Sequence, residues 1–158
     1  MEDHGWNEYA ASRLSTPTIL LGGYGFFSLW TELGLLGQSA RGALDVFGPL
    51  IRKELASVIV AAVASLAGVA VHLLGVAIAA VALAAAANLR SRQSFLTARM
   101  LVLFATFGAV VLPIADLLTF SCCAIVPALL LGAFALLGGM IALAALVDDG
   151  VRQGFAHE

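Results

Sequence analysis

Hydrophobic positions run almost without interruption through most of the chain, and short polar stretches divide them into blocks. The longest block, residues 55–89, carries no charge, and its only ionisable side chain is His72. Apolar runs of about eighteen or more residues are typical of membrane-spanning helices. As one helix this block would be about 50 Å long, whereas a hydrocarbon core is about 30 Å thick. Its excess length makes it the decisive stretch for the topology.

The blocks predict an all-α protein, a polytopic transmembrane helical bundle in one integral membrane domain. Four spans are expected, in chain order over residues 17–37, 55–89, 100–119 and 124–147. Around them we expect a polar N-terminal segment over 1–16, an amphipathic connection at headgroup level over 38–54 and a short tail over 148–158. Ser15 and Pro17 predict where the first span begins, because hydroxyls cap helices and proline suits the first helical position.

The long block can also be read as a short hairpin that turns near His72 and Gly75, which gives five spans. Basic residues collect on the cytoplasmic side of a membrane. Four spans divide them five against three, and five spans divide them seven against one. Against a turn, the sequence has no Pro, Asn or Asp there, and each half would have only about 15–17 residues. We therefore predict four spans with cytoplasmic N- and C-termini, and we keep five spans as the alternative.

Composition narrows the class of protein. The chain is 61% hydrophobic and 11% charged, with a mean hydropathy of +1.02. A soluble domain has about 25% charged residues, so the lipid bilayer is the expected surrounding. The net charge of −2 and the lack of a basic face argue against nucleic acid as a partner. Frequent Ala and Gly, with Arg in place of Lys, are typical of a GC-rich bacterial gene, so we place the protein in a bacterial inner membrane.

Two carboxylates inside the predicted spans are candidates for an ion or proton site. Glu32 lies near the end of the first span and Asp116 near the end of the third. A carboxylate in lipid is costly and is a functional hypothesis by default. With four spans the two would lie at similar depth on the non-cytoplasmic side, where they can bind a cation or relay a proton. The alternative is that both reach the interface and are hydrated.

His72 is a candidate ligand or proton carrier, because imidazole does both. Gly68, one helical turn earlier, would leave room for a flat tetrapyrrole, so haem or a pigment is a possible ligand. No second membrane-embedded histidine exists for a bis-histidine haem within one chain. The alternative is a hydrogen-bonded packing residue, and we predict no cofactor.

Cys122 and Cys123 are candidates for a soft-metal site, because thiolates prefer soft ions. The string SCCAIVPALLLG around them resembles the first vicinal-cysteine segment of small mercuric-ion transport proteins, in which a cysteine pair precedes a proline and a leucine-rich span. The resemblance implies that these two thiols accept the metal. Three residues rather than two separate Cys123 from Pro127, and a second cysteine pair is missing. The alternative is that two small side chains pack at a helix start.

Small residues four positions apart predict helix–helix contacts, since close backbone approach drives association in lipid. An alanine-rich chain also produces such spacings by chance. The packing residues expected from this pattern are Ala64, Gly68, Gly75, Ala79, Ala135, Gly138, Gly139 and Ala142.

No cluster of catalytic residues is visible, so we expect no enzyme. The leading hypothesis is a small membrane protein that forms a homo-oligomer or serves as a subunit or anchor of a larger membrane complex. The alternative is a small channel or transporter for protons, a cation or a soft metal ion.

Overall fold

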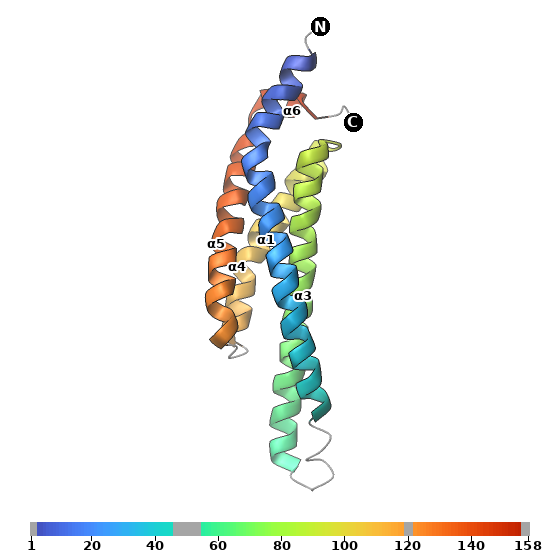
Figure 1. The fold of residues 1–158 in the computed structure, drawn as a ribbon, viewed down its shortest axis with the longest axis vertical. Helices are drawn as coiled ribbons and strands as arrows, with labels where there is room; N and C mark the ends of the chain where they lie inside the picture. Colours follow the sequence, from blue (N-terminus) through green and yellow to red (C-terminus); the bar gives the residue numbers. More distant parts are fainter. Residues whose placement is uncertain (1–2, 46–54, 119–121, 156–158) are drawn as a thin grey trace.

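The computed structural model describes residues 3–45, 55–118 and 122–155, and these form a bundle of antiparallel helices (Figure 1). Within these described residues, four helices contain stretches long and apolar enough to cross a membrane, which confirms the all-α, four-span prediction. The helices are α1 (Asp3–Asp45), α3 (Leu55–Ser91), α4 (Phe95–Leu118), α5 (Cys122–Ala145) and the short α6 (Asp149–Gln153).

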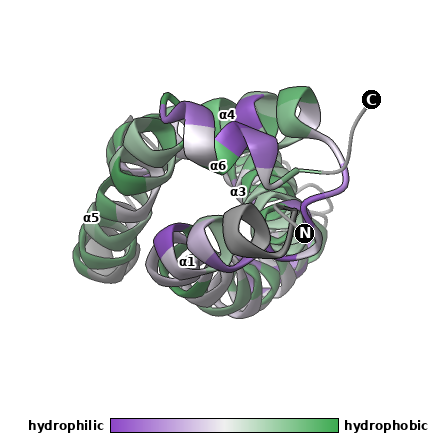
Figure 2. Ribbon diagram, turned by 90° about the horizontal axis from the view of Figure 1, so that it is seen from above, coloured by the Kyte–Doolittle hydropathy of each residue, from purple (hydrophilic) through white to green (hydrophobic). Residues whose placement is uncertain are grey.

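The four long helices form a closed ring in which each packs on the next along the chain and α5 packs back on α1. Figure 2 shows this arrangement from the end that carries both termini, where hydrophilic residues gather. Each of the four long helices contains an apolar stretch of spanning length. Helices suit an apolar surrounding because each satisfies its own backbone hydrogen bonds without water.

The buried core of the ring is rich in alanine, alongside larger side chains such as Leu21 and Leu89. Alanines fill the contacts between helices, and Ala82, Ala105 and Ala135 are completely buried. Large side chains such as Trp30 and Phe107 point outward. Lipid rather than water solvates the outer face, so hydrophobicity does not drive large side chains inward and close backbone packing favours small ones.

Helix α3 is continuous through His72 and Gly75. The five-span alternative, a hairpin over 55–89, is therefore wrong. No residue in this stretch interrupts the backbone hydrogen bonds, and Gly75 is held against α1 rather than freed for a turn.

Helix α1 is much longer than the predicted first span of 17–37. It begins at Asp3 and has Pro17 inside it, so the predicted start at Ser15 is wrong. The hydroxyl of Ser15 donates to the carbonyl of Ser12 rather than capping a helix. Leu14 and Pro17 are buried, and this packing carries the helix past the proline.

The connection expected over 38–54 also differs. Residues 38–45 continue α1, and residues 46–54, which carry the rest of that prediction, lie outside the described part of the chain. The third and fourth spans differ from the expected 100–119 and 124–147 by a few residues at their ends.

The two ends of the chain meet at one end of the bundle. The Tyr9 hydroxyl of α1 donates to Asp148 Oδ2 at 2.8 Å, and Asp148 Oδ1 accepts from the Gly150 N–H at the start of α6. These two hydrogen bonds, that from Tyr9 first, lower the pKa of the Asp148 carboxyl. The predicted tail of 148–158 thus contains a helix that packs on α1.

Helix lengths differ strongly between the two halves of the bundle. At ~1.5 Å per residue, α1 with 43 residues is about 64 Å long and α3 with 37 is about 55 Å long, whereas α4 and α5 with 24 each are about 36 Å. The paired α1 and α3 therefore extend beyond the end of α4 and α5 that is far from the termini (Figure 1).

Candidate functional site

Three ionisable side chains from three different helices converge inside the bundle. Glu32 comes from α1, His72 from α3 and Asp116 from α4, and their exposed fractions are 3%, 2% and 0%. One carboxylate oxygen of each acid and one ring nitrogen of His72 all lie within 4.8 Å of one another. We call Glu32, His72 and Asp116 the buried cluster.

The shortest contact in the buried cluster joins α1 to α3. His72 Nδ1 and Glu32 Oε2 are 2.8 Å apart, which is the length of a hydrogen bond between an imidazole and a carboxylate. A hydrogen bond needs a proton, so one proton is held between these two atoms. Either the Nδ1–H of a neutral imidazole or a protonated Glu32 carboxyl supplies this proton, depending on the tautomer of His72.

Gly75 makes the position of Glu32 possible. It lies one helical turn after His72, on the same face of α3. A Cβ atom at this position would lie 2.6 Å from Glu32 Oε2, which is too close for any real contact. Only glycine therefore lets the Glu32 carboxylate lie flat against the α3 backbone.

Hydroxyl groups line the same face of α1 leading to Glu32. Tyr24 and Ser28 lie eight and four residues before it, so helical spacing places all three on one side. A cavity of about 10 Å³ lies between α1, α4 and α5, and Tyr24, Ser28, Glu32 and Asp116 are among its lining residues. The Tyr24 hydroxyl is buried beside Ser28.

The donor set suits a small cation. One imidazole nitrogen and two carboxylate oxygens are ligands for Zn²⁺ and other divalent transition metals, which a site with three protein ligands binds with an open position. The cavity beside Glu32 and Asp116 has about the volume of one water molecule or one bare ion. The cluster can therefore hold either protons or a single metal ion.

The structure brings together three of the candidate residues from the sequence, Glu32, His72 and Asp116. It does not describe the side chains of the two candidate cysteines. Cys122 and Cys123 form the first turn of α5, and their side chains lie outside the described part of the chain. Gly68, where room for a tetrapyrrole was expected, lies against Ser39 of α1, whose side-chain oxygen would be 3.1 Å from a Cβ there. Helix α1 thus fills the space beside Gly68.

The predicted packing residues lie mostly at contacts between helices. Gly138 faces Leu20 of α1, and Gly139 faces Thr106 of α4. Buried positions are also held by Gly68, Gly75, Ala79, Ala135 and Ala142. Ala64 differs, because it is exposed in the part of α3 that extends beyond α4 and α5.

Sequence reasoning did not single out Tyr24, Ser28 or the role of Gly75. The spacing of Tyr24, Ser28 and Glu32 is a signal that was available, because polar residues four apart share a helix face. Comparison of the chain with protein-family models, curated proteins and solved structures finds no match. The functional argument therefore rests on the geometry of the buried cluster.

Proposed function

We propose that this integral membrane protein is a small non-enzymatic transporter that binds a divalent metal cation at the buried cluster in exchange for protons. The observation that carries the proposal is the convergence of Glu32, His72 and Asp116 to within 4.8 Å, with a hydrogen bond already shared between two of them. A buried group of this kind inside membrane helices is expensive and marks an ion or proton pathway.

Charge counting supports exchange rather than simple binding. With both carboxylates ionised and His72 neutral, the buried cluster carries a charge of −2 from its two acidic residues. One divalent cation or two protons would bring this charge to zero, and a net charge inside a membrane is strongly disfavoured. A metal that binds both carboxylates must displace any protons that neutralise them, since metal ligands are deprotonated, whereas neutral His72 can bind through one ring nitrogen and keep its proton on the other.

Transport in proteoliposomes tests the proposal. Vesicles that contain a metal indicator or a pH indicator report entry of Zn²⁺ or Mn²⁺ and the opposite movement of protons. We expect Glu32→Gln, His72→Gln and Asp116→Asn each to lower metal flux roughly tenfold or more, because each removes one ligand. Glu8→Gln is the matched control, since Glu8 is an exposed carboxylate near the N-terminus.

The thiols provide the competing explanation within the same experiment. A Cys122→Ser, Cys123→Ser double variant should transport normally if the buried cluster is the site. Flux that is lost in this variant, but is unchanged when Glu32, His72 and Asp116 are replaced, would contradict the proposal.

A second proposal, that the protein is a subunit of an oligomer or a larger membrane complex, is favoured by the length of α3. Its first turns carry exposed Val60, Val63 and Leu66 in the region beyond α4 and α5. A helix of about 55 Å has more apolar length than a hydrocarbon core of about 30 Å can cover. Native mass measurement in nanodiscs tests this proposal, and a lone monomer without a co-purifying partner would count against it.

A further inference from the structure

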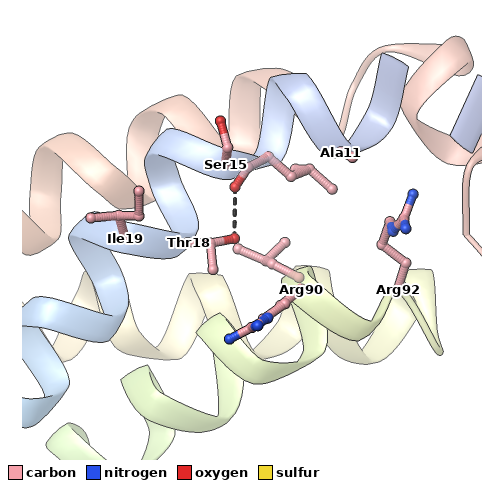
Figure 3. A pocket seen from close by; sticks show the side chains of 8 residues that line it. Ala11, Ser15, Thr18, Ile19, Arg90 and Arg92 are labelled. Atoms are coloured by element: carbon pink, nitrogen blue, oxygen red, sulfur yellow. Dashed lines mark hydrogen bonds between the residues drawn. The ribbon is translucent and has the colours of Figure 1, made fainter. Parts of the chain in front are cut away.

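A groove between α1 and α3 opens near the end of the bundle that carries the termini. It has a volume of about 300 Å³, and its lining includes Ser15 and Thr18 of α1 with Arg90 of α3 and Arg92, the first residue after α3. Figure 3 shows the two arginines on the α3 side of the groove and the two hydroxyl residues on the α1 side. We call this space the arginine groove.

The arginine groove continues along the bundle as an apolar channel. A second hollow of about 430 Å³ shares Thr18, Ile19 and Arg90 with it and is further lined by Gly22, Gly23, Ala86 and Ala87. The small side chains of these glycines and alanines leave the hollow open, and a Cβ on Gly23 would meet nothing within 4 Å. The combined space is therefore basic at its outer end and apolar toward the middle of the helices.

Arg92 occupies a backbone position that normally selects glycine. Its φ is 53°, and its N–H donates to the Asn88 carbonyl at 2.7 Å, which is the hydrogen bond that ends α3. Glycine or asparagine is usual at such a helix end because other residues are strained there. An arginine at this position is consistent with selection for the chemistry of its side chain.

Arg90 adds a second guanidinium at the mouth of the groove. Its side chain is exposed, and no acidic side chain among the described residues forms an ion pair with it. By contrast, Arg13 at the same end lies over the Tyr9 ring and donates to the Tyr9 hydroxyl. Arg90 is thus available to a ligand, whereas Arg13 is engaged within its own helix.

We propose that the arginine groove binds an anionic phospholipid, with the phosphodiester between Arg90 and Arg92 and an acyl chain along Gly22, Gly23, Ala86 and Ala87. Guanidinium groups bind phosphate oxygens through paired hydrogen bonds, and basic pockets between membrane helices bind anionic headgroups. The apolar continuation distinguishes a lipid from a free phosphate ion, which has nothing to place there. The proposal is independent of the transport function.

Lipid titration of the purified full-length protein in detergent, followed by native mass spectrometry, tests the proposal. We expect one phosphatidylglycerol per chain to bind in preference to phosphatidylcholine. An Arg90→Gln, Arg92→Gln double variant should weaken phosphatidylglycerol binding by about 30-fold, the factor that two arginines contribute at a membrane surface. Arg99→Gln is the matched control, because Arg99 is exposed at the same end but outside the groove.

Gly23→Leu tests the acyl part of the site separately. Because the groove has open space at Gly23, a leucine there should displace the lipid while helix content and monodispersity stay unchanged. In a third experiment, inorganic phosphate is added as a competitor, and the amount of bound lipid is measured. Equal binding of the two lipids, an equal loss in Arg99→Gln, or inorganic phosphate that displaces the lipid at similar concentration would each overturn the proposal.

Discussion

At the residue scale, the buried cluster shows how three costly side chains become tolerable together. Glu32, His72 and Asp116 would each be strongly disfavoured alone inside a membrane, because an isolated charge has no water to solvate it. In contact, the imidazole donates to or accepts from a carboxylate and offsets part of this cost. Gly75 is the fourth member of the arrangement, since it provides the space in which Glu32 lies.

Gly75→Ala should therefore weaken metal binding without unfolding the bundle. The added Cβ would collide with the Glu32 carboxylate, and Glu32 must move away from His72 to avoid it. Misplacement of a ligand that is otherwise intact costs roughly tenfold or more in affinity. Isothermal titration with Zn²⁺ in detergent measures the effect.

Gly34→Ala is the matched control for this substitution. Gly34 lies two residues from Glu32 on α1, it is exposed, and a Cβ there would meet nothing within 4 Å. Equal Zn²⁺ affinity in the two variants would show that the position of Glu32 does not depend on Gly75.

The sequence identified each residue of the buried cluster as a candidate, but it did not predict that the three side chains lie in contact. Ionisable residues in apolar runs are visible in any sequence, and this pattern singled out Glu32, His72 and Asp116. Their convergence depends on how each helix is rotated and shifted along its neighbours. That register is set by many alanine and glycine contacts that look alike in sequence, so the contact between His72 and Glu32 could not be derived.

At the scale of the elements, small residues and one proline set the spacing between α4 and α5. Pro113 has no N–H, so the Ala109 carbonyl one turn earlier lacks its usual helical donor. This carbonyl faces Gly132 of α5, where a Cβ would lie only 2.9 Å from the oxygen. Gly132 thus lets the two backbones approach where the hydrogen-bond ladder of α4 is interrupted.

Gly132→Ala should destabilise the bundle by about 1–3 kcal/mol, the usual cost of overpacking. The obstacle is a backbone carbonyl, which cannot rotate away as a side chain can. Unfolding in SDS followed by far-UV circular dichroism measures the loss. Ala133→Val, on the exposed face of the same helix, should change stability little, and an equal loss in both variants would refute this role of Gly132.

The existence of the elements was more predictable than their ends. Apolar length identified all four spans, because lipid exposure leaves a hydrophobic signal that water-soluble helices lack. The extension of α1 back to Asp3 was missed because Ser15 and Pro17 resemble a helix start. Tertiary packing of Leu14 and Pro17 against the bundle outweighs that local signal.

At the scale of the whole molecule, an even number of antiparallel spans places both termini at one end. The hydrogen bond between Tyr9 and Asp148 links the N-terminal part of α1 to the start of α6. Arg90, Arg92 and Arg99 lie at or near the connection between α3 and α4, and Arg13 and Arg152 lie in α1 and α6 at the same end. The basic-residue rule predicts that this end faces the cytoplasm.

Reporter fusions test this orientation. Green fluorescent protein fused to either terminus should fluoresce, and alkaline phosphatase fused to either terminus should be inactive, because only the first matures in the cytoplasm. Opposite results at the two termini would contradict an even number of spans. Active phosphatase at both termini would leave the bundle intact but reverse its orientation.

The depth of Asp116 has an electrical consequence. Asp116 lies two residues before the end of α4, on the side of the bundle away from both termini. When α4 spans the bilayer, an ion that enters from that side crosses only a small fraction of the membrane voltage before it reaches the buried cluster. An ion that leaves toward the termini crosses nearly all of it, at about 2.3 kcal/mol per unit charge for 100 mV. Voltage would therefore act mainly on the exit step and hardly on binding.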